Sequence, residues 1–299
     1  MNILVIDVGT SSIRGILYRK NGEKVFAKQV KYQPVHGENG RVEQPAKDFE
    51  DALILILRAF TARIHIFNAE IEAVAITAQR SSVIPLDASG QPLMNAIMWQ
   101  DTRNRDICRG LEKYDNEIFA LSGAKTNCVF SGGKMLWLRM VRPDIYEKVY
   151  KFVNIPEYLI HLMTGEYVTD HTYGSRSNLM NLRTREWDDR LLELFQIEKE
   201  KLCTLREPGS VVGVITEEFS HISGLREGVP VISAGGDQQC AAIGHGAYRE
   251  GAVSIVTGTG AFLVAASRQI PDNLTPDIIC NCSSIAGEYI IEANVLACC

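Results

Sequence analysis

Short apolar runs separated by turn residues open the chain. The uninterrupted apolar run at residues 3–6 predicts a buried β-strand. Residues 13–18 predict a second strand, and the Asn21-Gly22 pair that follows is the strongest short signal of a β-hairpin. Residues 25–30 predict a third strand. We therefore expect an antiparallel meander at the N-terminus, whereas a P-loop or dinucleotide-binding motif needs a helix directly after its glycine turn.

Apolar positions at helical spacing begin after Pro45. Leu53, Leu57 and Phe60 share one helix face, and Pro45 stands where the start of a helix tolerates proline. Helical and strand patterns then alternate. The sequence predicts helices over residues 46–67, from Asp101 onward, and over residues 131–140, 156–163 and 187–195. It predicts strands over residues 71–78, 83–86, 149–153, 211–215 and 229–233, and a polar, irregular segment over residues 170–178.

The last part of the chain repeats the pattern of its beginning. An apolar run at residues 252–256 leads into a Thr-Gly-Thr-Gly turn at residues 257–260, and a second apolar run follows at residues 261–266. Further strand candidates are residues 278–279, 284–285 and 289–291. Two strand–glycine turn–strand units indicate a duplicated α/β fold in which each copy offers a phosphate loop to a central cleft. The second copy is the shorter one.

Composition narrows the function classes. The 299 residues are 46% hydrophobic and 22% charged, as in an ordinary globular protein of about two domains. A net charge of −5 argues against a nucleic-acid partner, which would require a basic surface. No apolar run reaches the length of a membrane span, and Met1-Asn2 lacks the basic start of a signal peptide. We therefore expect a cytoplasmic protein without a membrane partner.

Two glycine turns are candidate phosphate cradles. Residues 7–12 read Asp-Val-Gly-Thr-Ser-Ser, in which Gly9 lets the backbone approach a phosphate and the hydroxyls of Thr10 and Ser11 can donate hydrogen bonds. Asp7, at the end of the first predicted strand, could hold Mg²⁺ directly or through water. The turn at residues 257–260 is the second candidate. Either segment could instead be a plain hairpin turn.

A third glycine turn carries an acid. The strand predicted at residues 229–233 runs into Gly235-Gly236-Asp237, and a helix of small residues is expected behind it. Ligand sites of α/β proteins lie at such strand ends, where a carboxylate can accept the proton of a substrate hydroxyl. Asp is also a favoured residue at the cap of a helix, so a structural role for Asp237 stays open at this point.

Arg80, Trp99 and Asp101 are candidate pocket residues, because each follows a predicted apolar strand. An indole ring can lie against the carbon skeleton of a polyol while charged groups bond its hydroxyls. A core tryptophan and a surface Arg–Asp pair are the structural alternatives.

Taken together and in this order, these motifs resemble the FGGY family of carbohydrate kinases, which share the actin-like, ribonuclease-H-like duplicated fold with a mixed sheet and flanking helices. The matching segments run across almost the whole chain. They are residues 7–12 with Arg14, Gln79-Arg80, residues 99–103, residues 131–134, residues 235–238 and residues 257–260.

The resemblance implies that ATP, with Mg²⁺, phosphorylates a hydroxyl of a small sugar, ketose or polyol. It implies that Asp237 is the catalytic base, that Gln238 is a neighbouring substrate contact, and that Asp7 stands near the metal and the phosphates. The other implied contacts are Arg80, Trp99 and Asp101 in the sugar pocket, Gly9, Thr10, Ser11 and Arg14 in the first phosphate loop, and Gly258 and Thr259 in the second. A homodimer is left open as the assembly.

Ser81 and Val129 depart from the pattern of glycerol kinases, which carry an acid after the arginine and a tyrosine before the Phe-Ser-Gly stretch. The expected substrate is therefore no narrower than a small sugar, ketose or polyol. The resemblance divides the chain into a sugar-binding domain, residues 1–245, and the start of a nucleotide-binding domain, residues 246–299, without its adenine-binding part. Whether it is a fragment or a truncated gene product, the 299-residue chain alone is expected to turn over poorly.

Two other functions stay open. A non-catalytic actin-fold protein that binds sugar or regulates a partner would keep the pocket and lose the ATP half, although it has no need of a base at Asp237. An actin-like or Hsp70-like ATPase shares the fold and both phosphate loops, but it does not explain Arg80, Trp99 and Asp237 together.

Overall fold

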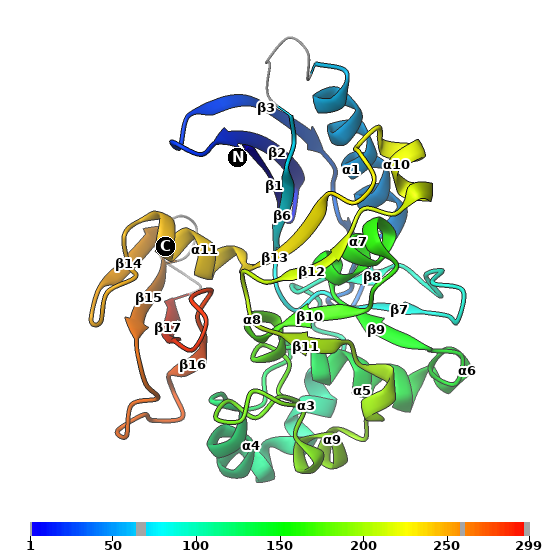
Figure 1. Cartoon of the computed structure of the whole chain (residues 1–299). Helices are drawn as coiled ribbons and strands as arrows, with labels where there is room; N and C mark the ends of the chain where they lie inside the picture. The colour runs from blue at the N-terminus through cyan, green and yellow to red at the C-terminus, as the bar shows by residue number, and fades with distance from the viewer. Residues whose placement is uncertain (1, 64–69, 258–260, 296–299) are drawn as a thin grey trace.

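A six-stranded sheet forms the centre of the protein. The structure is a computed structural model that describes residues 2–63, 70–257 and 261–295 (Figure 1). The strand order is β12-β13-β6-β1-β2-β3. The bounds are β1 Asn2–Val8, β2 Ser12–Arg19, β3 Lys24–Lys31, β6 Ala73–Ala78, β12 Val211–Val214 and β13 Pro230–Gly236. β1, β6 and β13 run parallel, while β2, β3 and β12 pair antiparallel with their neighbours. The predicted N-terminal meander is confirmed.

Helices cover one face of this sheet (Figure 1). They are α1 Ala46–Thr61, α7 Ile155–Thr164 and α10 Glu217–Ser223. The predicted apolar face of α1 is the buried one, since Leu53, Leu57 and Phe60 lie in the same core as Leu4 and Ile6 of β1. Among the described helices, none is both long and apolar enough to cross a bilayer.

A second group of helices, below the sheet in Figure 1, has a separate core that includes Leu138, Phe152 and Phe195. The helices are α3 Arg105–Leu111, the 3-10 turn η1 Glu112–Tyr114, α4 Asp115–Ser122, α5 Ser131–Val141, α6 Pro143–Tyr146, α9 Asp189–Phe195 and the 3-10 turn η2 Lys199–Lys201. Short strands join this group to the main sheet: β4 Val35–His36, β5 Val42–Gln44, β7 Ile84–Leu86, β8 Ala96–Ile97, β9 Lys151–Val153, β10 Val168–Asp170 and β11 Thr204–Arg206.

A separate antiparallel sheet, in the order β14-β15-β17-β16, follows α11 Asp237–Gly244. Its strands are β14 Val253–Thr257, β15 Ala261–Ser267, β16 Ile279–Cys282 and β17 Tyr289–Val295. The antiparallel pair β14–β15 repeats the pair β1–β2, as the sequence pattern predicted. The predicted domain boundary at residue 245 falls directly after α11 and stays a prediction.

Three predicted elements were placed wrongly. The helix expected from Asp101 begins only at Arg105, because the Asp101 carboxylate is used in a buried ion pair before the helix starts. The strand expected at residues 284–285 is instead part of the turn between β16 and β17. The helix expected to reach Phe67 ends at Thr61, and residue 67 lies outside the described residues.

The segment at residues 170–178 was also predicted wrongly as irregular. It contains the end of β10 and a one-turn helix, α8 His171–Gly174 (Figure 1). Asp170 caps this helix by accepting a hydrogen bond from the backbone N–H of Thr172 at 2.8 Å. The segment is polar in sequence because its side chains hydrogen-bond inside the protein, not because it faces water; both Asp170 and Thr172 are fully buried.

Candidate active site

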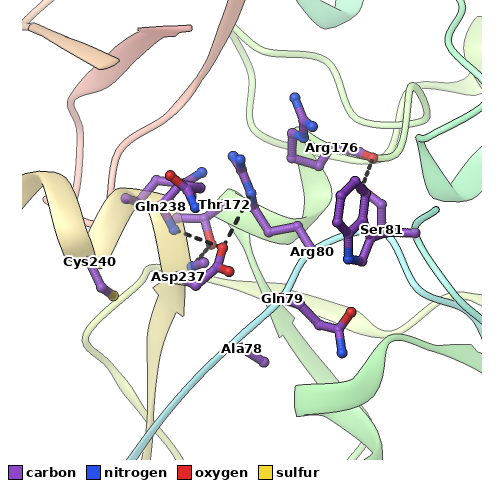
Figure 2. Close-up of polar contacts among 12 residues, drawn as sticks. Ala78, Gln79, Arg80, Ser81, Thr172, Arg176, Asp237, Gln238 and Cys240 are labelled. Atoms are coloured by element: carbon purple, nitrogen blue, oxygen red, sulfur yellow. Dashed lines mark hydrogen bonds and ion pairs between the residues drawn. The ribbon is translucent and has the colours of Figure 1, made fainter. Parts of the chain in front are cut away.

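Three parallel strands of the main sheet end at the same edge. The end of β1 carries Asp7, β6 leads to Arg80, and β13 leads to Asp237. Such an edge is where α/β proteins place their ligands. Figure 2 shows the side chains of Arg80 and Asp237 pointing toward each other, with Gln238 next to Asp237. The sheet thus gathers residues that are far apart in the sequence.

Asp237 is the first residue of α11, and its side chain is about one-third exposed (32%). Its Oδ1 accepts a hydrogen bond from the backbone N–H of Gln238 at 2.8 Å and lies 3.8 Å from Nε of Arg80. Burial raises the pKa of Asp237, the positive charge of Arg80 lowers it, and the negative charges of Asp7 and Glu292 raise it further. The carboxylate therefore lies beside one cation and feels the charge of two other acids.

Two glycines shape the loop before Asp237. Gly235 has a φ of +105°, and a Cβ there would lie 2.1 Å from Oγ of Ser284, in the turn of the second sheet. A Cβ on Gly236 would lie 2.6 Å from Cδ of Arg80. The pairing of β13 with β6 shifts its register just before this point, so the strand bulges. Only glycine lets Arg80 and the second sheet come this close to the loop.

Tyr173 of α8 bridges the two strands at this bulge. Its hydroxyl accepts a hydrogen bond from the Ala78 N–H at 2.9 Å and donates one to the Gly235 carbonyl at 2.9 Å. Thr77 Oγ1 donates to the same carbonyl at 2.7 Å. Side chains thus satisfy buried backbone groups where the regular ladder is interrupted.

Thr172 of α8 holds the peptide directly before Asp237. Its Oγ1 accepts the N–H of Gly236 at 2.8 Å and donates its own hydrogen to Asp170 (Figure 2 shows Thr172 beside Asp237). The other oxygen of Asp170 accepts from Ser233. Burial raises the pKa of Asp170, while the hydrogen bonds from Ser233 and Thr172 lower it. A buried chain of hydrogen bonds therefore runs from the body of β13, through α8, to the loop.

Arg80 is fixed from the second sheet. Both terminal nitrogens of its guanidinium donate to the carboxylate of Glu292 on β17, with 3.2 Å between Nη2 and Oε2. Nη1 of Arg176 donates to the same carboxylate at 3.3 Å, as does Nδ2 of Asn281 at 3.0 Å. Although burial raises the pKa of Glu292, the charges of Arg80 and Arg176 lower it to about 2. Glu292 is therefore ionised at neutral pH and joins the two sheets across the site.

The turn between β1 and β2 contains the predicted phosphate loop. The N–H of Gly9 donates to the Ser12 carbonyl at 2.9 Å, and the Gly9 carbonyl accepts from the Tyr32 hydroxyl at 2.7 Å. Thr10 Oγ1 accepts the indole N–H of Trp99 at 2.9 Å. The predicted sugar-pocket tryptophan thus contacts the predicted phosphate loop, so the two candidate subsites adjoin.

The remaining loop candidates lie along the same edge or outside the described residues. Arg14 on β2 stands opposite Asp7 in the strand register, and Ser11 is exposed in the turn. Burial raises the pKa of Asp7, and the charge of Arg14 lowers it. Gly258 and Thr259, predicted for the second phosphate loop, fall outside the described residues.

The carboxylate of Asp101 is engaged in a buried ion pair with Arg103. It is fully buried, its Oδ2 accepts the Val42 N–H at 2.6 Å, and Nη2 of Arg103 lies 2.7 Å from the same oxygen. Within the described residues, the hydrogen bonds of its carboxylate go to these two partners. This geometry resembles the structural alternative for Asp101, an Arg–Asp pair, except that the pair is buried.

A magnesium ion fits the donors at this edge. Within the described ranges, no group of three or more His, Cys, Asp or Glu side chains could form a metal site from protein atoms alone. Mg²⁺ that binds with a nucleotide needs only one or two carboxylates, since phosphate and water oxygens complete its shell. Asp7 and Asp237 lie close enough to repel each other, and burial raises the pKa of each. A cation beside Asp7 would relieve this repulsion.

The sequence interpretation missed the side chains that support the site: Asp170, Thr172, Tyr173, Arg176 and Glu292. Two signals could have indicated them. The Asp-x-Thr spacing at residues 170–172 is typical of a helix start. Glu292 is the one acid of a mostly apolar strand, where a buried charge requires a partner.

The fold and the site define an α/β protein of the actin-like type, with an acid–arginine pair where its two sheets meet. The chain belongs to the FGGY family of carbohydrate kinases, whose N-terminal domain matches residues 2–244. The predicted family and fold are confirmed.

Individual relatives agree with this assignment. The glycerol kinase of Thermococcus gammatolerans is 32% identical over 268 residues, which cover 88% of this chain and 53% of that protein. A structure of gluconate kinase from Lactobacillus acidophilus gives a TM-score of 0.92 at 26% identity, over 99% of this chain and 60% of that one. Plasmodium falciparum glycerol kinase with ADP gives 0.91 at 26% identity, over 98% and 61%. The chain spans about half the length of the first of these relatives (53%).

Proposed function

We propose that the whole protein transfers the terminal phosphoryl group of ATP to a hydroxyl of a small sugar, ketose or polyol. The observation that carries this proposal is the Asp237–Arg80 pair, which lies at the edge shared by the ends of β1, β6 and β13. A glycine turn suited to phosphate lies at the end of β1 and contacts Trp99 through the hydroxyl of Thr10. Base, cation, apolar ring and phosphate turn are the parts that transfer to an alcohol requires.

Asp237 acts as the general base in this proposal. It accepts the proton of the attacking hydroxyl while the oxygen of that hydroxyl bonds to phosphorus. Burial raises the pKa of Asp237 toward neutrality, which makes its carboxylate a stronger base than an ordinary aspartate. The positive charge of Arg80 opposes this rise.

Arg80, Trp99 and Gln238 orient the substrate. Both terminal nitrogens of Arg80 donate a hydrogen bond to the carboxylate of Glu292. A guanidinium has more N–H groups than these two bonds use, so others remain for a substrate oxygen. Trp99 is half-buried, and with its N–H bonded to Thr10 it can offer its ring face to a carbon skeleton.

The β1–β2 turn serves the phosphates. Gly9 allows close backbone approach, and Thr10, Ser11 and Arg14 are the proposed contacts around it. Asp7 would hold Mg²⁺, which supplies neutralising charge to the transferred group when bound. Gly258 and Thr259 remain proposed contacts of the same phosphates.

The substrate class rests on the relatives and on Ser81. The matched relatives include a glycerol kinase and a gluconate kinase. We therefore propose a polyol or sugar in the size range from glycerol to gluconate. Ser81 has a left-handed backbone (φ +70°), is buried, and its hydroxyl donates to the Arg176 carbonyl at 3.3 Å. The position after Arg80 therefore faces the interior and offers no acid to a substrate, so we do not choose glycerol within this class.

Asp237→Asn tests the catalytic role in the whole protein. We expect kcat for ATP-dependent phosphorylation to fall by about 10²–10⁴-fold with the sugar Kd nearly unchanged. Asp189→Asn is a matched control, because Asp189 is likewise the first residue of a helix, α9, but is exposed. ADP release with glycerol, xylulose and gluconate measures the effect. An undiminished kcat in the Asp237 variant would remove this residue from its role.

The same assay addresses the non-catalytic alternative. A wild-type protein that binds a sugar in calorimetry but releases no ADP with a broad panel of ketoses, aldoses and polyols would favour a binding or regulatory function.

We also propose a cytoplasmic location without nucleic-acid or membrane partners. Sedimentation would show whether the protein is a homodimer.

A further inference from the structure

A polar cavity of about 700 Å³ lies beside α8 and shares no lining residue with the Asp237–Arg80 pair. His171 at the start of α8 forms part of its wall. The turn at residues 183–187 and the segment at residues 199–207 form most of the rest. The volume falls in the range of small-molecule sites.

Positive charge exceeds negative charge in this cavity. Its lining contains four cationic side chains, Lys151, Arg183, Arg185 and Lys199, and two acidic ones, Glu186 and Glu207. This local excess is opposite in sign to the net charge of −5 of the whole chain. An electropositive concavity on an acidic protein points to an anionic ligand.

The cations on the wall are held mainly by neutral acceptors. Nζ of Lys151 donates to the Glu200 and Leu202 carbonyls at 2.6 and 2.9 Å. Nη2 of Arg185 donates to the Gly287 carbonyl at 2.5 Å, and the carboxylate of Glu207 is 3.9 Å from its Nη1. Carbonyl groups orient these cations without cancelling their charge, so the charge is available to a ligand.

His171 supplies an independent observation. The residue is only 8% exposed, it lines the cavity, and its Nδ1 has no hydrogen-bond partner among the described residues. Oε2 of Glu207, whose side chain is 48% exposed, is 3.5 Å from this nitrogen. Leaving a buried polar atom unpaired costs about 1–3 kcal/mol, which a ligand that accepts the Nδ1 hydrogen would recover.

We propose that this cavity binds a small molecule bearing a phosphate group, with Arg183, Arg185 and Lys199 around the phosphate and His171 donating from Nδ1. Guanidinium and ammonium groups are the usual partners of phosphate oxygens. The inference goes beyond the proposed kinase function and does not depend on it.

The cavity is connected to the candidate active site through the backbone. His171 immediately precedes Thr172, which accepts the N–H of Gly236 before Asp237. Arg185 holds the turn between β16 and β17 through Gly287. A phosphate bound between these groups would restrain α8 and this turn together, and we expect it to slow amide hydrogen exchange at Gly236.

The test is a titration of ¹⁵N-histidine-labelled protein with inorganic phosphate and with methyl phosphate, followed by NMR. His171→Asn assigns the resonance. We expect a saturable shift of the His171 signal with both phosphates and none with sodium chloride at equal ionic strength. The double variant Arg183→Gln, Lys199→Gln, whose side chains are exposed, should weaken the affinity about tenfold.

A control variant removes two positive charges that lie outside the cavity. The double variant Lys24→Gln, Arg226→Gln removes the same charge from exposed positions that do not line the cavity and should bind as the wild type does. A His171 shift that sodium chloride reproduces, or an affinity equal in both double variants, would overturn the proposal. Binding of inorganic phosphate without methyl phosphate would also overturn it, because a phosphate ester is then excluded. Phosphate binding is read without ATP, so an inactive kinase would not alter the result.

Discussion

The two strand ends that build the candidate active site are stabilised in different ways. The turn after β1 is closed by neighbours in the sequence. The N–H of Gly9 donates a hydrogen bond to the Ser12 carbonyl, and the pairing of β1 with β2 sets the register of the hairpin. The loop after β13 is held by remote residues, since Thr172 and Tyr173 of α8 bond to its backbone. The backbone of the first turn is thus closed by its own hairpin, whereas the backbone of the second depends on side chains of a distant helix.

This difference indicates which half of the site should be more sensitive to substitutions at distant positions. The hydrogen bond that closes the β1–β2 turn spans only three positions, and its distant partners Tyr32 and Trp99 reach one carbonyl and one hydroxyl of the turn, so we expect its backbone to keep its geometry when distant residues change. The Asp237 loop bulges from its sheet, and its backbone groups are bonded by Thr172 and Tyr173 of α8 and by Thr77 of β6. Distant substitutions should therefore disturb Asp237 more than Asp7.

The largest effect is expected from Glu292→Gln. The pKa of Glu292 is about 2 in the folded protein against an ordinary 4.5. Because the folded pKa is depressed, the stabilisation is complete above pH 4.5 and is lost as the pH falls toward 2. Glu292→Gln should lower the free energy of unfolding by about 3 kcal/mol at pH 7 and by about half as much near pH 3.

Urea denaturation at both pH values measures this prediction. Glu218→Gln is the control, because Glu218 is exposed and has no ion pair among the described residues. A difference between wild type and Glu292→Gln that stays the same at pH 7 and pH 3 would contradict the assigned role of the carboxylate.

Matched glycine substitutions compare the two loops directly. Gly235→Ala should cost about 1–3 kcal/mol, because φ is +105° and the new Cβ would meet Ser284 Oγ at 2.1 Å. Gly9→Ala should cost under about 1 kcal/mol, since its nearest contact would be the Ser12 carbonyl oxygen at 3.4 Å. Thermal or urea unfolding distinguishes them. Equal losses would mean that the loops are not supported differently.

Thr172→Val tests the support from α8. Valine keeps the shape but cannot accept the N–H of Gly236, so we expect a loss of about 1–2 kcal/mol in stability. In the whole protein, kcat should fall more than KM for the sugar rises, because the loop position affects the base more than the pocket. Thr172→Ser restores the acceptor and should rescue kcat. A Ser variant as impaired as Val would point to packing of the methyl group instead.

The smallest effect is expected from Thr10→Val. The substitution removes the acceptor of the Trp99 indole N–H and should cost about 1 kcal/mol or less. The tryptophan emission spectrum should shift, while the unfolding of Thr10→Ser should match the wild type. A Thr10→Val protein with an unchanged spectrum would show that the indole does not depend on this hydroxyl.

Much of the fold followed from local patterns. The runs at residues 3–6 and 13–18 around Gly9, and the Asn21-Gly22 turn, predict the meander because a hairpin is decided by neighbouring residues. The α1 face was predictable because its apolar residues recur at helical spacing. Residues 170–178 were not, because buried polar side chains that bond one another look like a surface loop in sequence.

The sequence by itself determined the strand ends that carry Asp7, Arg80 and Asp237, because apolar strands and glycine turns are local signals. Only the tertiary structure decided that Glu292 holds Arg80, that Thr172 holds the peptide before Asp237, and that Asp101 is buried with Arg103. The reason is physical: a buried charge or an interrupted sheet ladder needs a partner, but nothing in the linear pattern specifies which distant residue the fold brings to it.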